Sequence, residues 1–584
     1  MKFMKLGTRP DIFYTEEATR TVISDVPSDL VIRINNITYL IHKFPVVAKC
    51  GLLQRLCSNH SGGDGDGDGD TVITIELHDI PGGEDAFELC AKFCYGITIN
   101  LSAHNFVSAF SAANFLRMTE SLHRANFISK LEAFFLSCIL AGWKDSIATL
   151  RSSSSAAAAA AALSEWSHNL GITTKCIDSV VHKILTPPSK VSWSYTYTRP
   201  GYNKKTHRSV PKDWWTEDIA DLDIDLFRCV IVAISSTCIL PPPLIGEALH
   251  VYASRWLPDA KIAAPKQPEE ASSDTTTTNI EAKNRQIVET IISLIPPDRE
   301  SVSVSFSLRL LRLGNLLGAS AVCKTEVIRR CSLVLEEATV GDLIFSSQQH
   351  PDEHNLQDVD LVVAVLESFL MVWRRQSPVE NNGQLLASVR KVGKLIDSYL
   401  QVVARDRNMP VAKMVCLAEA LPDVARPNHD DMYKAINIFL KEHPDVSKAE
   451  KKRLCRVLNC QKLSPEVRAH AVKNERLPLR TVVQVLFFDQ DKGSKTSSRV
   501  AAAATEEVLL SRPKPKQRPA TATGENLSLS RPGPDEKLRR SESTKSRPTK
   551  EKSDHDQKMK TSSDQFESRR KVVVKGEGEE RYGG

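Results

Sequence analysis

Apolar and polar residues alternate close to the N-terminus, in "SDLVIRINNITYLIHKF". Two alternating runs, residues 30–34 and 37–41, flank two asparagines, which tolerate the positive φ of a tight hairpin turn. "PVVAKCGLLQRL" then has helical spacing, "TVITIEL" predicts a third strand, and longer helical patterns cover residues 84–95, 102–118 and 121–138. Few strands followed by several helices predict an α+β domain.

Residues 213–490 keep a helical period almost throughout. The prolines at 241–243 and 296–297 break that period. Ser447 with Glu450 forms a capping box, and Ser464 before Pro465 gives an N-cap with proline at the first helical position. This region therefore predicts a large all-α domain. An α-solenoid-like stack is the expected architecture, although no fixed repeat period is present.

Two composition changes divide the chain. "RSSSSAAAAAAALSEW" predicts a linker, because serines disfavour helix interiors and a pure alanine stretch has no apolar face to bury. Beyond residue 490 the only aromatics are Phe566 and Tyr582, so this tail cannot bury enough apolar area to offset its ordering entropy. The predicted organisation is an N-terminal lead (1–25), an α+β domain (26–145) with a flexible Gly/Asp insert (61–70), a linker (146–212), a helical domain (213–490) and a disordered basic tail (491–584).

The charge is unevenly distributed. The tail holds 22 Lys and Arg against 15 Asp and Glu, so its net charge is +7. Residues 1–490 carry −1, and the two together give the net charge of +6 of the whole chain. The folded part thus has no field for polyanions, and the tail nearly lacks stacking aromatics, so no nucleic-acid partner is expected. The thirteen cysteines fall mostly in apolar helical pattern, as free thiols do in reducing compartments. With no secretory signal and no run of 18 apolar residues, a cytoplasmic protein is expected.

The helical domain closes on an unusually apolar helix, "RLPLRTVVQVLFF". Eight of the positions from 477 to 488 are apolar, which is too many for one stripe. We therefore expect this helix to be buried on most sides and to close the core, rather than to line an exposed partner groove.

Two motifs imitate metal sites. "HPDEH" gives His350 and His354 the inverted zinc-protease spacing, but the setting "SSQQHPDEHNLQD" is polar and contains proline, which favours a solvated loop. "DGDGDGD" from Asp64 imitates a calcium loop, but the twelfth position needs a bidentate carboxylate and is Ile75. A flexible acidic loop is the better interpretation, so no metal is expected.

Enzyme motifs are also missing. Cys90 with Cys94, and Cys455 with Cys460, lack the CxxC spacing of a zinc or redox site. The chain has no GxxxxGK[ST], no GxSxG and no GxGxxG after a strand, which are the usual phosphate, acyl and dinucleotide devices. We expect no cofactor and a protein that is not an enzyme.

Longer blocks resemble a known family. "SDLVIRINNITYLIHKFPVV" resembles the opening hairpin of a BTB (POZ) domain with its entry into the first helix at His42 and Lys43, and "FCYGITINLSAHNFVSAFSAANFLRM" resembles its later elements. The helical region resembles that of the plant non-phototropic hypocotyl and root phototropism family of BTB proteins, in "DWWTEDIADLDIDLF", "IPPDRESVSVSFSLRLLRLGNLLGAS", "HDDMYKAINIFLKEHP", "KKRLCRVLNCQKLSPE" and "NERLPLRTVVQVLFFDQ". The resemblance covers residues 1–490.

This resemblance implies a substrate-specific adaptor of a cullin-RING E3 ubiquitin ligase in plant light or auxin signalling. The BTB domain would self-associate and dock on a cullin scaffold, with Asp29, His42, Lys43 and Phe44 as candidate docking or dimer residues, while other surfaces recruit clients that the sequence does not name. Many cullin-binding BTB domains carry a hydrophobic residue, any residue and an acid just before the third strand, where this chain has the Gly and Asp run at 62–70. A dimeric signalling scaffold at the plasma membrane, without a ligase role, therefore stays open as the alternative.

Three residues are candidate phosphorylation sites. Tyr433 follows two acidic residues, as kinase sites do, but its helical spacing with Ile436 and Phe439 favours packing. In the tail, "KLRRSESTKSRP" makes Ser541 and Ser543 candidates, and a phosphate there would create a ligand for a phospho-dependent adaptor. The basic clusters "RPKPKQR" and "RRKVVVKG" suit an anionic membrane surface, which would hold the protein peripherally at the plasma membrane.

Overall fold

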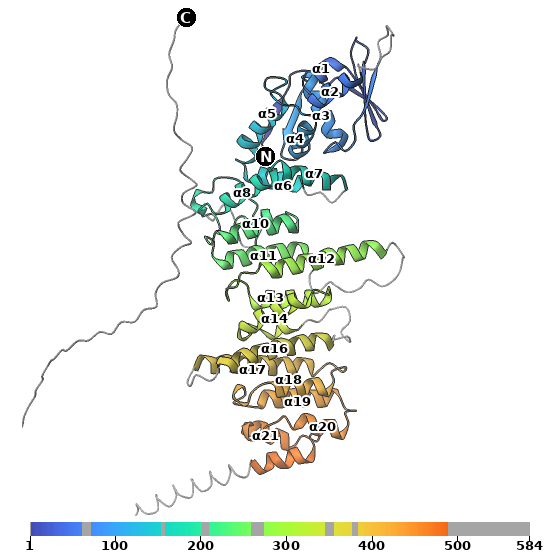
Figure 1. Cartoon of the computed structure of the whole chain (residues 1–584). Coiled ribbons are helices and arrows are strands. Elements are labelled where there is room, and N and C mark those ends of the chain that lie inside the picture. The colour runs from blue at the N-terminus through green and yellow to red at the C-terminus, as the bar shows by residue number, and fades with distance from the viewer. Residues whose placement is uncertain are drawn as a thin grey trace, which may run out of the picture. The chain divides into compact units, whose positions relative to one another are not determined.

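The computed structural model describes residues 2–60, 72–153, 158–200, 202, 209–258, 274–344, 356–376 and 383–488 (Figure 1). All of these residues belong to a first compact unit, residues 1–504, and a second unit covers residues 505–584. The predicted insert at 61–70 and the predicted tail at 491–584 lie outside the described residues. None of the helices within the described ranges has the length and apolar character that crossing a membrane requires.

The N-terminal domain is built on a five-stranded sheet with the order β2-β3-β5-β4-β6. The predicted hairpin is confirmed, because β4 and β5 pair antiparallel from Leu30 opposite Ile41 to Ile34 opposite Ile37, and Asn35 has a φ of 50° in the turn. The predicted third strand is β6, which pairs parallel with β4. The strands of this sheet are β2 (Phe13–Glu16), β3 (Thr19–Val22), β4 (Leu30–Ile34), β5 (Ile37–Ile41) and β6 (Ile73–Glu76).

The N-terminal lead, residues 1–25, for which the sequence pattern predicted no element, contains strands. It contributes β2 and β3 to the sheet and also forms β1 (Phe3–Leu6). β1 pairs antiparallel with β7 (Ile99–Ser102), and β3 pairs parallel with β5. β2 and β3 pair with each other within the lead, but β1 and the sheet position of β3 depend on partners that come later in the chain, so tertiary pairing decides them.

Helices complete the N-terminal domain and bury the inner residues of the hairpin. Leu30, Ile32 and Ile41 have no exposed surface, and Phe87 and Phe106 from two of the helices are almost fully buried. The described helices of this domain are α1 (Lys43–Val47), α2 (Gly51–His60), α3 (Gly83–Tyr95), α4 (Phe106–Phe115) and α5 (Phe127–Phe134), followed by a π-helical turn, η1 (Phe135–Ile139). The predicted α+β fold class is confirmed.

The segment assigned to a linker, residues 146–212, contains packed helices. It holds most of α6 (Trp143–Ser152), then α7 (Ala158–Asn169) and α8 (Ile172–Ile184), and α6 packs on α8. Ile172, Cys176 and Val180 are buried. The domain boundaries themselves stay a prediction, but this connection is not a free chain. Of the Ser and Ala run, residues 151–152 belong to α6 and residues 158–166 belong to α7.

From α9 onward the described chain is helical, as predicted, and successive helices pack on one another: α13 on α14, α14 on α16 and α17 on α19 (Figure 1). The predicted capping box is present, with the Ser447 hydroxyl and the Glu450 backbone N–H 3.2 Å apart, and Ser464 caps a helix with Pro465 in its first turn. The helices are α9 (Thr216–Ile219), α10 (Ile224–Ser236), α11 (Pro242–Trp256), α12 (Asp274–Leu294), α13 (Val304–Leu316), α14 (Ala321–Leu333), α15 (Val340–Leu343), α16 (Leu356–Gln376), α17 (Gly383–Val403), α18 (Val411–Ala420), α19 (Asp430–Glu442), α20 (Lys448–Cys455) and α21 (Pro465–Val472).

A last helix, residues 479–488, follows α21. Thr481 and Val485 are buried, but Leu479 is 78% exposed and Phe487 is 60% exposed. The prediction that this helix is buried on most sides is therefore wrong. It is the last described member of the stack, so described neighbours pack against only one of its faces, and the apolar residues on the other face lie open within the described part of the chain.

Candidate functional site

The entry into α1 joins three of the four residues predicted for docking. The Asp29 carboxylate accepts a hydrogen bond from the Lys43 backbone N–H at 2.7 Å, which satisfies a donor that the helix start leaves free. The His42 ring contacts the Tyr95 hydroxyl at 3.0 Å and the Val26 carbonyl at 2.9 Å. Burial raises the pKa of Tyr95 to about 12, so this hydroxyl stays protonated. Asp29 and His42 thus hold the corner from within, rather than presenting their side chains to a partner.

Phe44 is the docking candidate that the fold does expose. It lies in the first turn of α1 and is 85% exposed. Ile23 and Val26 are exposed apolar residues as well. The Val26 carbonyl contacts the His42 ring, and this contact holds Val26 beside the start of α1. We use the name Phe44 corner for Val26 and Phe44 together with Ile23, which precedes Val26 by three residues in the chain. Apolar side chains that gather on a surface mark an interaction site more often than single ones do.

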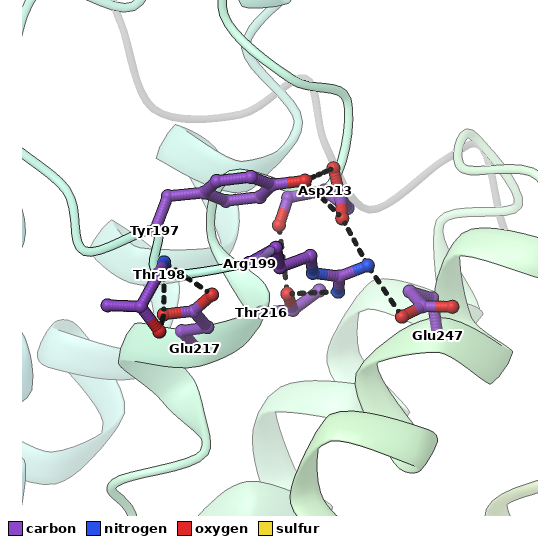
Figure 2. A network of polar contacts seen from close by, with 7 residues as sticks. All are labelled: Tyr197, Thr198, Arg199, Asp213, Thr216, Glu217 and Glu247. Carbon is purple, nitrogen blue, oxygen red and sulfur yellow. Dashed lines mark hydrogen bonds and ion pairs between the residues drawn. The ribbon is translucent and has the colours of Figure 1, made fainter. Parts of the chain in front are cut away.

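A second feature is the strap, which we define as residues 191–200, an extended segment between α8 and α9. Figure 2 shows how Arg199 anchors it: the guanidinium contacts the Asp213 carboxylate at 3.0 Å and the Glu247 carboxylate of α11 at 2.7 Å. The other terminal nitrogen of Arg199 donates to the Thr216 hydroxyl at 3.4 Å. One cation therefore connects the strap to α9 and α11.

The neighbouring strap residues add contacts of the same kind (Figure 2). The Tyr197 hydroxyl donates to the Asp213 carboxylate at 3.2 Å. The backbone N–H and the hydroxyl of Thr198 donate to the Glu217 carboxylate at 2.9 and 3.0 Å. Burial, and then the charge of Asp213, raise the pKa of Tyr197. Each charged group of this network has a partner of opposite charge or a hydrogen-bond donor, so the network fixes the strap in one place.

Aromatic packing backs the strap. Trp214 is almost fully buried, and its ring lies 4.6 Å from that of Trp143 and 5.6 Å from those of Trp193 and Tyr195. The Trp143 indole N–H donates to the Asp218 carboxylate at 2.6 Å. Trp143 begins α6 and Asp218 belongs to α9, so this cluster couples the end of the N-terminal domain to the start of the helical region.

The strap was not predicted from the sequence. Its stretch "SWSYTYTRP" alternates aromatic and polar residues, and this signal of a packed extended segment was available. The residues that bind the strap could not be predicted, because Asp213, Glu217 and Glu247 become its partners only through the packing of α9 and α11.

Tyr433, the predicted kinase site, lies inside the helical region. Its side chain is 3% exposed. Its hydroxyl lies 2.7 Å from Nδ1 of His470 and accepts a hydrogen bond from the Asn474 side chain at 3.1 Å. The burial favours the packing interpretation, and phosphorylation of Tyr433 stays a prediction that would require α19 to open first.

Some of the other predicted sites lie among the described residues and some do not. His350, His354, Asp64, Ser541 and Ser543 lie outside the described residues. All thirteen cysteines are free, and those of the Cys90/Cys94 and Cys455/Cys460 pairs are buried. Among the residues that the structure describes, no group of three or more His, Cys, Asp or Glu is arranged to hold a metal ion.

Comparisons with known proteins agree on one family. The NPH3 family model matches residues 213–467. A BTB/POZ domain-containing protein of Arabidopsis thaliana is 60% identical over 85% of this chain and 86% of its own length. A phototropic-responsive NPH3 family protein of the same plant is 37% identical over 85% and 78%, and its root phototropism protein 3 is 35% identical over 83% and 77%. No solved structure matches the chain.

Proposed function

The chain belongs to the NPH3 family of BTB/POZ proteins, and from this premise we propose that it is a non-enzymatic adaptor that bridges a cullin-RING E3 ubiquitin ligase to client proteins. Its relatives bear names from phototropism, so the pathway we propose is plant light or auxin signalling. An adaptor needs a surface for its own assembly and a rigid connection to the surface that holds clients.

The Phe44 corner is the observation that supports this proposal most directly. Phe44, Ile23 and Val26 expose apolar area on a domain whose far end is coupled by the strap to the helical region. A second copy meeting the same patch would cover all three side chains in an isologous contact. Two copies joined in this way carry two client surfaces, so weak single contacts add up to avidity.

The oligomeric state tests this role of the corner. The full chain is expected to be a dimer at micromolar concentration, and Phe44→Asp is expected to make it monomeric, because a charge would be buried in the contact. Val322→Asp is the matched control, since Val322 is an exposed apolar residue of α14, and it should leave the dimer intact. Sedimentation equilibrium measures both. A Phe44→Asp chain that remains dimeric would contradict the proposed interface.

Cullin binding separates the two forms of the proposal. The dimeric chain is incubated with a purified cullin N-terminal domain, and binding at micromolar concentration supports the ligase adaptor. Absence of binding favours the alternative, a dimeric signalling scaffold at the plasma membrane without a ligase role. The Gly and Asp run at 62–70 supports this alternative, because it stands where many cullin-binding BTB domains have a hydrophobic residue, any residue and an acid.

We propose that the protein is cytoplasmic and associates peripherally with the plasma membrane through the basic clusters of residues 491–584. Deleting these residues is expected to weaken co-sedimentation with phosphatidylserine vesicles. Equal co-sedimentation of the full and shortened chains would end this part of the proposal.

A further inference from the structure

A cleft of about 520 Å³ lies between the end of α20 and the start of the last helix, residues 479–488. Four cationic side chains, Lys452, Arg453, Arg456 and Arg480, line it, and all four residues are exposed. None of the described residues that line it is acidic, and buried Cys455, Leu458 and Thr481 form part of its wall. We call it the basic cleft. Its volume is in the range of pockets that accept ligands.

The four cations of the basic cleft have no partners within the described residues. None of their side chains makes an ion pair or hydrogen bond with another described residue, and Glu450, an acid of the same helix, is engaged by Ser447 in the capping box. Four like charges that converge without compensation repel one another, which costs stability. An anion bound between them would remove that cost.

Helix stability does not account for the whole cluster. Lys452 and Arg453 lie in the last turn of α20, where cations interact favourably with the helix dipole. Arg480 lies in the first turn of the last helix, where the dipole disfavours a cation. The first hydrogen bond at the start of that helix runs from the Thr481 N–H to the Pro478 carbonyl. The backbone N–H groups of Leu479 and Arg480, which come before it, therefore have no acceptor within the helix. Arg480 and these N–H groups together suit an anion.

The surface that continues from the basic cleft is apolar. Arg480, Gln484 and Phe487 are spaced i, i+4 and i+7, so they share one side of the last helix, with Val483 beside them. Phe487 and Val483 are exposed. Three guanidinium groups match the paired oxygens of a phosphate or carboxylate. A matching ligand therefore carries an anionic group next to apolar side chains, which describes a peptide, whereas a small soluble polyphosphate would use the cleft alone.

We propose that the basic cleft binds a phosphorylated segment of a client protein, with the phosphate between Arg453, Arg456 and Arg480 and the flanking apolar side chains on Phe487. The inference rests on the proposed function only in naming a client as the source of the segment. Phosphorylation of the client would then control its recruitment, since the phosphate supplies the charge that the cleft lacks.

Fluorescence anisotropy of the full chain with two labelled peptide pools tests the proposal. One pool has a fixed central phosphoserine among degenerate, apolar-rich positions, and the other has serine in its place. The phosphorylated pool is expected to bind at least tenfold more tightly, in keeping with two or more charge-assisted hydrogen bonds. The double variant Arg456→Gln with Arg480→Gln should lose most of this preference. Lys448→Gln with Arg476→Gln is the matched control, because these are exposed cations beside the cleft that do not line it.

Phe487→Ser separates the possible ligands. It is expected to weaken the phosphorylated pool several-fold while leaving the binding of inositol hexakisphosphate unchanged. Equal binding of both pools, or no binding of either, overturns the proposal. The proposal is also overturned if the loss of Arg456 and Arg480 weakens binding to phosphatidylserine vesicles or to inositol hexakisphosphate but not to the phosphorylated peptide pool. That result would assign the cleft to lipid or to a soluble polyphosphate. Cullin binding and dimerisation are measured on another surface, so their failure would leave this result intact.

Discussion

The strap and the basic cleft are both rich in charge, but they treat it in opposite ways. In the strap, Arg199 meets two carboxylates at 3.0 and 2.7 Å and its neighbours are hydrogen-bonded to acids. In the basic cleft, Arg453, Arg456 and Arg480 have no partner among the described residues. Charges that are paired within the fold stabilise it, whereas charges that converge unpaired are arranged for something outside it.

Two buried polar groups in the same C-terminal region also have partners within the fold. The buried Arg426 guanidinium donates to the Asp397 carboxylate at 2.8 Å. His429 is buried, and its Nδ1 accepts a hydrogen bond from the Asn459 backbone N–H at 3.2 Å. Arg426 and His429 thus have partners inside the fold, whereas the four exposed cations that converge on the basic cleft have none within the described residues.

The largest expected effect is at the strap's aromatic support. Trp214→Ala should lower the free energy of unfolding by about 3–5 kcal/mol, because it removes a buried side chain that packs on three other aromatic rings. Urea unfolding followed by circular dichroism measures the change, with Trp214→Phe as the control that retains most of the packing. A loss of less than 1 kcal/mol on Trp214→Ala would mean that the strap region is not a stabilising element.

The next effect concerns pH. Burial, together with the charges of Arg426 and Lys462, lowers the pKa of His429 from 6.5 to about 4. Below pH 6.5 the folded state then binds fewer protons at this site than the unfolded state, so the free energy of unfolding falls as the pH is lowered from 6.5 towards 4. Above pH 6.5 His429 is deprotonated in both states and adds no pH dependence. The contribution is up to about 3 kcal/mol.

The variant His429→Asn isolates this effect, since the asparagine side-chain oxygen matches the position of Nδ1 and accepts the bond from the Asn459 N–H but does not titrate. Between pH 6.5 and 4 it should lose less stability than the wild type. The comparison also cancels Asp397, whose pKa burial raises to about 6 and whose own contribution therefore falls as the pH rises through that range. Parallel stability curves for the two chains would show that His429 titrates normally.

The smallest effect gives the sharpest contrast between the two regions. Arg199→Gln should cost about 1–2 kcal/mol, because it leaves Asp213 and Glu247 without their cation. Arg456→Gln, the same substitution in the basic cleft, should change stability by less than about 0.5 kcal/mol. Unfolding midpoints of the two variants measure the difference. Equal losses would remove the distinction between structural and ligand-directed charge.

The sequence predicted those elements whose signals are local. The β4–β5 hairpin was readable because its alternation and its asparagine turn lie within a dozen positions, and Asn35 does adopt a positive φ. The capping box was readable for the same reason, because Ser447 and Glu450 bind each other across one helical turn. His42 and Lys43 lie at the entry into the first helix, as the resemblance implies, and their role in docking stays a prediction. The inward hydrogen bonds of Asp29 and His42 were not readable, because only the fold brings Lys43, Val26 and Tyr95 to them.

The sequence by itself thus determined the α+β domain, the helical region and the family, because periodicity, caps and long blocks of residues are properties of the chain read in order. The tertiary structure decided which residues face outward. β1 and β3 of the lead found their partners in β7 and β5. The last helix kept Leu479 and Phe487 exposed because described neighbours pack on only one of its faces. Burial depends on neighbours that are distant in sequence, so an apolar pattern specifies an element but not how many of its sides are covered.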